Sequence, residues 1–535
     1  MKPPGPDRSL LVLLAGWGAL AVAAIWLRPL WPVDETRYAS VAWEMWLRGD
    51  FLVPHVNGEP YSHKPPLLFW LIHLGWAVFG VNDWWPRLVG PLCALGSIPL
   101  LLKLEGILWG RNGDSPGHAV WILFGTLLFA GFITLTMFDL LLVLCVMAAM
   151  VGVLELARHR RGAGVLWLGA GIGLGVLAKG PVVLLHVLPA ALAAPWWAPQ
   201  TRSRLGPWVL DLLLGVLLGA AIALAWALPA GLAGGEAYRN AIFWGQTAGR
   251  VAESFAHRAP WWYYLPLLPL ILFPWLVWPR LWRGMRELKT DDPALRFLAA
   301  WLVLTVIGFS LVSGKQAKYL LPMVPGFALL AAHALDRIAS PARGWEMALP
   351  ALGFLALPAG LAWVRAAPAA LKLPEWAAQM PLWPVLVLAL CAPVVMFFCK
   401  RENTIQLRVL SLATLFAFAV LGAGVIPAFA PYADPYPAAQ FLAAQQRLGV
   451  PLAHLGKYHA QYNFAGRLRA PIAILEPREL GAWVAAHPGG EVITVERTRF
   501  AAAGAAQPEY QGPFRGAWVQ VWRGRALLEA RPELR

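Results

Sequence analysis

Runs of about 20 apolar residues, nearly free of charge, recur along this chain from Ser9 to Pro431. Each run is long enough to cross the ~30 Å hydrocarbon core of a bilayer as an α-helix, which satisfies its own backbone hydrogen bonds. Only 14% of the 535 residues are charged, whereas a soluble protein carries roughly a quarter. The chain is therefore predicted to be a mainly α-helical, polytopic membrane protein.

Basic loops give the predicted spans a direction. Loops 158–161, 280–289 and 400–408 carry clustered Arg and Lys, which is typical of the cytoplasmic side. This orientation puts 28–85, 231–262 and the chain from 431 onward outside. We interpret the first run as a retained span, because no clear small-residue cleavage site follows it. We predict about thirteen spans, namely 9–27, 86–104, 118–135, 137–156, 165–179, 181–198, 207–230, 263–282, 295–313, 319–336, 346–364, 381–399 and 409–430.

Two domains follow from this pattern. Residues 1–430 form a membrane domain with a long first outer loop, 28–85, in which 34–48 predicts an amphipathic helix and 66–79 an interfacial one. Residues 431–535 have an ordinary soluble composition. Helical patterns at 437–448 and 478–487 and strand patterns at 451–455, 491–496 and 516–522 predict a small outer α/β domain.

Three acidic residues lie at the predicted outer boundary. Asp34 and Glu35 follow the first span, beside Arg37 and Tyr38, and Asp139 lies at the outer start of span 137–156. A charge there is costly unless it is paired or faces a wet cavity, and carboxylates at this boundary suit acid–base or sugar-hydroxyl chemistry. Structural alternatives stay open: Asp34 as the cap of a helix that begins at Glu35, and Asp139 as a charge favoured by the helix dipole.

Cations gather on the same side. They are Arg37, Lys64, Lys179, Arg250, Arg258, Lys315 and Lys318. Positive residues are disfavoured outside, so a collection of them indicates a bound anion such as a lipid phosphate. Snorkelling at span ends explains any single one equally well. Because several recur with acidic residues among them, we favour a phosphate site.

Histidines and cysteines give weaker signals. His63, His257 and His459 lie in three outer segments and would form a zinc site if the fold brought them together. All four cysteines lie in apolar runs, with neither a disulfide framework nor zinc spacing. The net charge of +15 resides largely in short loops, and no base-reading motif is present. No nucleic-acid partner is predicted.

Several motifs occur in a fixed order along the chain. They are DETRYA, EPYSHKPPLLFWL, WPRLVG, the span-start Asp139, LAKGP, HRAPWWYYLP and KQAKYLLPMVP. This ordered set resembles the bacterial relatives of protein O-mannosyltransferases, including the lipid A aminoarabinose transferases, over about residues 1–430. The resemblance implies a GT-C membrane bundle in the bacterial inner membrane, with a periplasmic C-terminal domain and an active site facing the periplasm.

The resemblance also implies a donor and site residues. The donor would be a polyprenyl-phosphate sugar, usually undecaprenyl-linked. Asp34 matches the family's catalytic acid, with Glu35 beside it, and Asp139 matches its acid at a span start. Residues expected at the donor phosphate are Arg37, Lys64, Arg250, Lys315, Lys318 and Tyr319.

The predicted activity is inverting transfer of that sugar to an envelope acceptor. By resemblance, the sugar is 4-amino-4-deoxy-L-arabinose or a related sugar, and the acceptor is lipid A. His63 stands where the aminoarabinose transferases commonly have Glu, which leaves the sugar and a zinc ion open. Mannose or another hexose moved to protein or to another envelope glycan is the alternative. A transporter or lipid flippase is the rival class, and it would place polar residues at mid-span rather than at outer span ends.

Overall fold

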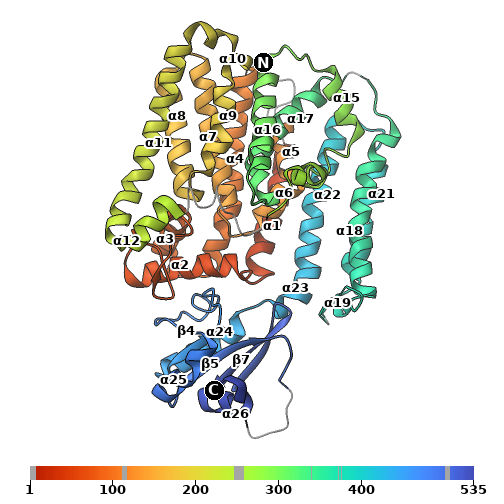
Figure 1. Ribbon diagram of the computed structural model, residues 1–535. Helices are drawn as coiled ribbons and strands as arrows, with labels where there is room; N and C mark the ends of the chain where they lie inside the picture. The colour runs from red at the N-terminus through yellow and green to blue at the C-terminus, as the bar shows by residue number, and fades with distance from the viewer. Residues whose placement is uncertain are drawn as a thin grey trace.

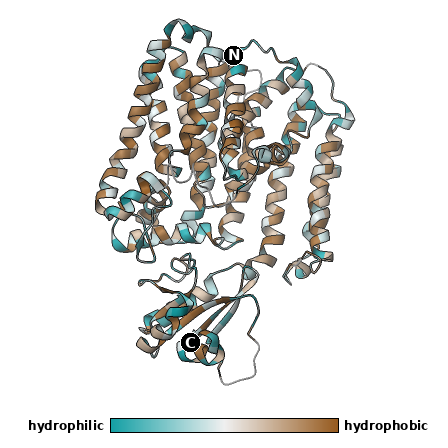
Figure 2. Ribbon diagram, viewed as in Figure 1, coloured by the Kyte–Doolittle hydropathy of each residue, from teal (hydrophilic) through white to brown (hydrophobic). Residues whose placement is uncertain are grey.

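A helical bundle with a small mixed domain at one end makes up the molecule (Figure 1). The computed structural model describes residues 8–110, 117–245, 258–338, 340–371, 373–374, 376–500 and 506–534. Apolar residues dominate the long helices, and hydrophilic residues gather at the two ends of the bundle and on the small domain (Figure 2). A bilayer around the bundle requires this banding.

Nine helices among the described residues are long and apolar enough to cross a membrane. They are α1 (Arg8–Trp26), α4 (Trp84–Trp109), α7 (Asp139–Ala157), α8 (Arg161–Lys179), α11 (Leu205–Ala233), α16 (Pro293–Leu311), α17 (Val324–Asp336) with the preceding turn η4 (Ala317–Met323), α18 (Ala348–Ala366) and α22 (Asn403–Val420). Each overlaps one predicted span. α7 is central, packs against α4 and α8, and buries most of its residues.

Each of the other four predicted spans is interrupted, so nine of the about thirteen predicted spans are formed by long helices among the described residues. The interrupted spans are α5 (His118–Gly125) with α6 (Leu127–Ile133), α9 (Val182–Leu192) with α10 (Ala194–Trp197), α14 (Tyr264–Ile271) with α15 (Pro279–Glu287), and α20 (Trp383–Ala389) with α21 (Cys391–Phe397). Pro274 lies between α14 and α15, and proline removes a helix donor. Between α5 and α6, Thr126 is extended, and the backbone N–H of Leu127 donates to the Phe273 carbonyl at 2.9 Å.

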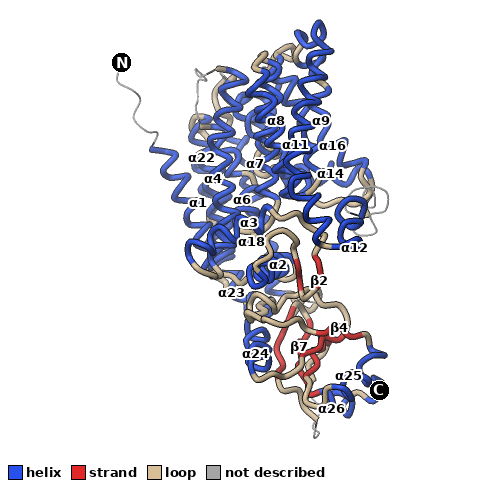
Figure 3. Tube along the Cα trace, turned by 90° about the vertical axis from the view of Figure 1, so that its left-hand side faces the viewer, coloured by secondary structure: helices blue, strands red, loops and turns tan. Residues whose placement is uncertain are grey.

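The first outer loop matches its predicted helices closely. α2 (Asp34–Arg48) covers the predicted amphipathic segment, and α3 (Leu67–Phe79) starts after the two prolines that follow Lys64. Between them lies a hairpin of β1 (His55–Val56) and β2 (Glu59–Pro60). α2 lies across the end of the bundle, between it and the small domain (Figures 1 and 3). The short helices α12 (Gly235–Asn240), α19 (Trp376–Gln379) and α23 (Ile426–Phe429) lie at the same end.

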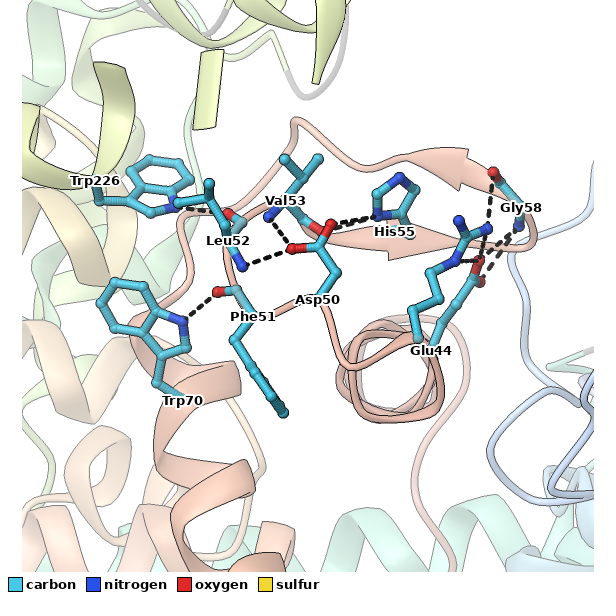
Figure 4. Close-up of polar contacts among 10 residues, drawn as sticks. Glu44, Asp50, Phe51, Leu52, Val53, His55, Gly58, Trp70 and Trp226 are labelled. Carbon is cyan, nitrogen blue, oxygen red and sulfur yellow. Dashed lines mark hydrogen bonds and ion pairs between the residues drawn. The ribbon is translucent and has the colours of Figure 1, made fainter. Parts of the chain in front are cut away.

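Two tryptophans fasten the segment after α2 to the bundle (Figure 4). Trp70 Nε1 of α3 donates to the Phe51 carbonyl at 2.7 Å. Trp226 Nε1 of α11 donates to the Leu52 carbonyl at 2.9 Å. The Asp50 carboxylate accepts from the backbone N–H of Leu52 at 2.9 Å. The C-terminal end of α2 is thereby anchored through two helices that come from different parts of the chain.

The tail forms a five-stranded mixed sheet with the order β4-β3-β5-β7-β6. Its elements are α24 (Tyr436–Arg447), β3 (Leu452–Leu455), β4 (Ala473–Leu475), α25 (Leu480–Ala486), β5 (Glu491–Glu496), β6 (Tyr510–Phe514), β7 (Ala517–Arg523) and α26 (Gly524–Ala530). β3 is parallel to β4 and β5, whereas β7 is antiparallel to β5 and β6. The sequence predicted α24, β3, α25, β5 and β7, and it missed β4, β6 and α26.

Candidate active site

The first turn of α2 forms a polar site between the bundle and the tail. Asp34 starts the helix and makes no side-chain cap bond, so the capping alternative is wrong. Its carboxylate accepts from Arg37 Nη2 at 2.5 Å and lies 4.0 Å from Lys318 Nζ of η4. The Asp34 side chain is 42% exposed, which leaves it accessible to a ligand.

Glu35 points the opposite way, into the bundle. Its carboxylate accepts from Arg28 at 2.5 and 2.8 Å and from the backbone N–H of Thr136 at 2.5 Å, and the residue is 2% exposed. Arg28 also donates to the Thr134 carbonyl. These contacts tie the end of α1 to the segment that precedes Asp139. We therefore revise the expected role of Glu35 from catalysis to positioning.

Asp139 is buried at the start of α7. Lys179 Nζ, at the end of α8, donates to Asp139 Oδ1 at 2.5 Å. The same ammonium lies 5.4 Å from the centre of the Tyr319 ring. A buried charge is stable when it is paired in this way. Asp139 is thus both a helix-start charge and one half of an ion pair.

An aromatic wall connects these groups. Phe138 packs edge-on against the Tyr38 ring at 4.8 Å, and Lys64 Nζ lies 5.7 Å from the centre of the Phe138 ring. Burial, followed by the Asp34 carboxylate, raises the pKa of the Tyr38 hydroxyl above its ordinary value. Tyr38 therefore stays protonated and able to donate a hydrogen bond. Phe138 directly precedes Asp139, so the wall joins the α2 and α7 parts of the site.

Another predicted phosphate-binding cation, Lys315, lies outside this group of contacts. Lys315 is 4% exposed, and its Nζ donates to the Ala259 carbonyl at 3.0 Å and the Val312 carbonyl at 2.5 Å. This contact fastens two loops together, so we revise the role of Lys315 from phosphate binding to loop closure. Arg250 lies outside the described residues.

The histidines do not form a metal site within the described residues. His63 packs against the Tyr61 ring at 5.4 Å, whereas His459 belongs to the loop after β3 in the tail. His257 lies outside the part of the chain that the structure describes. No group of three His, Cys, Asp or Glu side chains that could hold a metal ion occurs among the described residues. The zinc site stays a prediction, because its third ligand is His257.

An apolar cavity of about 540 Å³ lies beside the polar site. It is lined by α1, α6, α14 and the segment Leu421–Ile426 after α22. Arg28 and Thr134 mark its polar end, and Ala317, the neighbour of Lys318, also lines it. The cavity therefore lies next to Arg28, the partner of Glu35, and to the residue that precedes Lys318, whereas Asp34 itself does not line it.

Among the residues that the structure describes, more basic than acidic side chains meet at this boundary. We define the outer site as Asp34, Arg37, Lys64, Asp139, Lys179 and Lys318. This set holds four basic and two acidic side chains, a formal net charge of +2. This excess suits an anion that carries one or two negative charges.

Sequence reasoning missed the pairing within this site. Lys179 was noticed only as a cation at an outer span end, and no motif linked it to Asp139, 40 residues earlier. Arg28 was not assigned a role, because its separation of seven residues from Glu35 spans the end of one helix and the start of another. Both pairings are created by the packing of helices.

Comparisons with known proteins agree with this architecture. Residues 63–227 match a family model described as dolichyl-phosphate-mannose-protein mannosyltransferase. The undecaprenyl phosphate-alpha-4-amino-4-deoxy-L-arabinose arabinosyl transferase of Serratia proteamaculans is 32% identical over 340 residues, 60% of this chain and 59% of that protein. Its namesake from Pseudomonas aeruginosa strain LESB58 is 34% identical over 333 residues, 61% of this chain and 59% of that protein. The chain thus covers about three fifths of these relatives.

Solved structures show the fold. ArnT from Cupriavidus metallidurans bound to undecaprenyl phosphate has a TM-score of 0.76 at 21% identity, over 96% of this chain and 98% of that one. Its apo state has a TM-score of 0.73 at the same identity, over 97% and 98%. The shared fold is a mainly helical membrane bundle with a small mixed sheet at its C-terminal end.

Proposed function

We propose, on the premise that this chain is related to the dolichyl-phosphate-mannose-protein mannosyltransferases and the bacterial aminoarabinose transferases, that it is a membrane glycosyltransferase. Its donor is a polyprenyl-phosphate-linked sugar, with undecaprenyl as the lipid. It acts at the periplasmic face of the bacterial inner membrane. The observation that carries the proposal is an accessible carboxylate among an excess of cations, beside an apolar cavity.

The apolar cavity suits the lipid part of the donor. Its lining is almost entirely aliphatic and aromatic, so a polyprenyl chain loses no hydrogen bonds there. Ala317 lines the cavity, and Lys318 follows it in the chain. A prenyl chain in the cavity would therefore present its phosphate to the cations of the outer site.

Those cations suit the chemistry of a glycosyl phosphate. When the bond between the anomeric carbon and the phosphate oxygen breaks, its electron pair stays on that oxygen. The donor phosphodiester has one negative charge, and the departing phosphate gains a second. Preorganised cations lower the barrier most where charge develops, as it does here on the phosphate. Lys64, Lys318 and Arg37 supply this stabilisation without a nucleotide or its metal.

Asp34 is the group that meets the acceptor. An acceptor oxygen attacks the anomeric carbon from the face opposite the phosphate, so a single displacement inverts the configuration. Asp34 orients that oxygen, or takes its proton when the acceptor is a hydroxyl. An acceptor phosphate needs no base, and Asp34 then orients the sugar and pairs with its ammonium if it is an aminosugar. Asp139 and Lys179 hold the neighbouring wall in place.

The relatives support an assignment of the sugar, and the sequence resemblance supports one of the acceptor. We assign 4-amino-4-deoxy-L-arabinose or a related sugar, which the names of the relatives contain, and lipid A as the acceptor. A hexose such as mannose moved to protein or to another envelope glycan is the second candidate, because the family model is named for protein mannosyltransferases. Both candidates use the same donor cleavage.

A zinc ion on His63, His257 and His459 is a separate proposal. Imidazole nitrogens are good zinc ligands, and two of the three histidines lie on outer segments that the structure describes. No step of the transfer is assigned to this ion. Metal analysis of the purified protein, with His459→Ala as the comparison, tests the proposal, and metal-free wild-type protein would refute it.

Mass spectrometry of lipid A and envelope glycans from cells with and without the gene tests the proposed function. We expect an aminopentose on lipid A that disappears with the gene and returns with wild-type protein, but not with Asp34→Asn. Loss of a hexose from another glycan would favour the second candidate. An unchanged set of glycans, with substrate moved across vesicles and no bond cleaved, would support a transporter and refute the proposal.

A further inference from the structure

The edge of the tail sheet that faces the bundle is formed by the carboxyl ends of its parallel strands. The β6–β7 turn lies at the same edge, because Glu496 at the end of β5 pairs with Trp518 near the start of β7. The loop after β3 contacts α2: Ser40 Oγ donates to the Ala460 carbonyl at 2.7 Å and accepts from the Phe464 N–H at 3.0 Å. In α/β sheets, this is the edge at which ligands bind.

Two exposed cations lie at this edge. Lys457 belongs to the loop after β3, and Arg515 belongs to the β6–β7 turn. Ala460, whose carbonyl accepts from Ser40 of α2, lies three residues after Lys457 in the same loop. Neither Lys457 nor Arg515 pairs with a carboxylate among the described residues.

The backbone holds one of these cations in place. The Arg515 N–H donates to the Tyr432 carbonyl at 2.6 Å, which links the turn to the segment that leaves the bundle. On the same side, Trp43 Nε1 of α2 donates to the Leu468 carbonyl at 2.8 Å. The tail is therefore docked on α2 through several separate contacts, so the loop and the turn that carry Lys457 and Arg515 are held near the helix that begins at Asp34.

The donor does not account for these tail cations. The cavity for its lipid lies in the bundle, and the outer site already carries an excess of positive charge for its phosphate. An acceptor that attacks opposite the phosphate approaches from the other side of the sugar. The tail edge docks on α2, the helix that begins at Asp34, and positive charge there attracts a second anion.

We propose that Lys457 and Arg515 bind a phosphate of the acceptor that does not itself react. The pair would select an anionic glycolipid with two phosphates over a neutral hydroxyl acceptor. Arg515 offers a planar fork of donors that suits a phosphate, and Lys457 adds a mobile point charge. This inference rests on the proposed function, and it names the residues that read the acceptor.

The test uses full-length protein in phosphatidylcholine vesicles with an undecaprenyl-linked sugar donor. The acceptor is lipid A with both phosphates, or lipid A from which one has been removed. For the double variant Lys457→Ala and Arg515→Ala, we expect the acceptor KM for the bisphosphorylated lipid to rise about tenfold to a hundredfold. We expect kcat and the donor KM to stay within about twofold, because donor contacts are untouched. Removing the second phosphate should weaken the wild type similarly and the double variant no further.

Two controls separate this role from a structural one. Arg447→Ala with Arg525→Ala removes two exposed arginines near the opposite edge of the tail and should leave the acceptor KM unchanged. Lys457→Arg should retain most of the acceptor affinity. An unchanged acceptor KM in the double variant, or an equal loss with both acceptors, overturns this inference alone. Wild-type protein that transfers sugar to neither lipid overturns the proposed acceptor together with it.

Discussion

Each end of the bundle holds a carboxylate between two cations, but only one of these carboxylates is open. At the outer end, Asp34 lies between Arg37 and Lys318 and keeps 42% of its side chain exposed. At the end away from the tail, Glu346 binds two arginines at 2.5 and 3.1 Å and is fully buried. The two carboxylates have similar charged partners, and they differ in how much of the side chain is exposed.

In the closed cluster around Glu346, the arginines donate their hydrogen bonds to other groups of the protein. Arg280 also donates to the Ser340 carbonyl and to Asn403, and Arg283 also donates to Ser340. These contacts join α15, the turn before α18 and the start of α22. A buried charge with such partners stabilises one arrangement of helices but cannot exchange them for a substrate. At the outer site, by contrast, the Asp34 carboxylate stays accessible to a ligand.

Asp34→Asn should give the largest effect. We expect kcat/KM for sugar transfer to fall about a thousandfold, because the amide keeps the shape but loses the charge that acts on the acceptor. The midpoint of thermal unfolding should stay near the wild-type value, since Asp34 is partly exposed. Transfer assays and thermal unfolding of the purified variant measure both. Activity within about tenfold of the wild type would remove Asp34 from the reaction.

Glu346→Gln should reverse that pattern. Two buried arginines lose their neutralising carboxylate, which costs about 3 kcal/mol of unfolding free energy and lowers the thermal midpoint. The kcat of the protein that remains folded should not change, because Glu346 binds the arginines of α15, a helix at the end of the bundle away from the tail (Figure 1). Glu35→Gln, at the outer end but equally closed, should show a similar loss of stability. If the midpoint of thermal unfolding stayed unchanged in both variants, buried carboxylates would not differ from exposed ones in their contribution to stability.

Lys318→Met should weaken the reaction less than Asp34→Asn. The methionine keeps much of the side-chain volume and removes one of the phosphate-facing charges, so kcat/KM should fall about thirtyfold. Lys289→Met, an exposed lysine outside the outer site, is the matched control and should behave like the wild type. Equal activities of the two variants would show that Lys318 only snorkels.

Glu491 in the tail offers a smaller test of a closed carboxylate. Burial, followed by Glu509, raises its pKa to about 7, and one of its oxygens has no hydrogen-bond partner. The pKa of the Glu491 carboxyl in the folded protein lies above the ordinary value of 4.5. The stability that this carboxyl contributes is therefore complete below pH 4.5 and is lost as the pH rises through 7. Glu491→Gln should therefore be more stable than the wild type by about 2 kcal/mol at pH 8 and not at pH 4.5. An equal difference in unfolding free energy between Glu491→Gln and the wild type at both pH values would contradict this.

The sequence predicted elements that rest on local patterns. The amphipathic period of 34–48 predicted α2, which buries one face, and the β-branched run at 491–496 predicted β5, whose first four residues are all buried. The α5–α6 break could not be predicted this way. It depends on a backbone bond between Leu127 and Phe273, which belong to distant segments.

The same limit applies to the site. The sequence indicated that Asp34 and Lys318 carry chemistry, because both are charged at outer span ends, but only the fold shows them 4.0 Å apart. Asp34 and Glu35 are neighbours with nearly identical chemistry, and they point in different directions because α2 turns about 100° per residue. A motif contains both residues, whereas packing decides that Asp34 stays exposed and Glu35 is buried.

Direct binding of undecaprenyl phosphate to purified protein tests the central claim, that the outer site grips a lipid-linked phosphate. We predict that the double variant Lys64→Met and Lys318→Met raises the Kd at least about tenfold, while Asp34→Asn binds as well as the wild type or more tightly and Lys289→Met does not differ. If the double variant bound undecaprenyl phosphate as tightly as the wild type, these cations would not hold the donor and the account would be wrong.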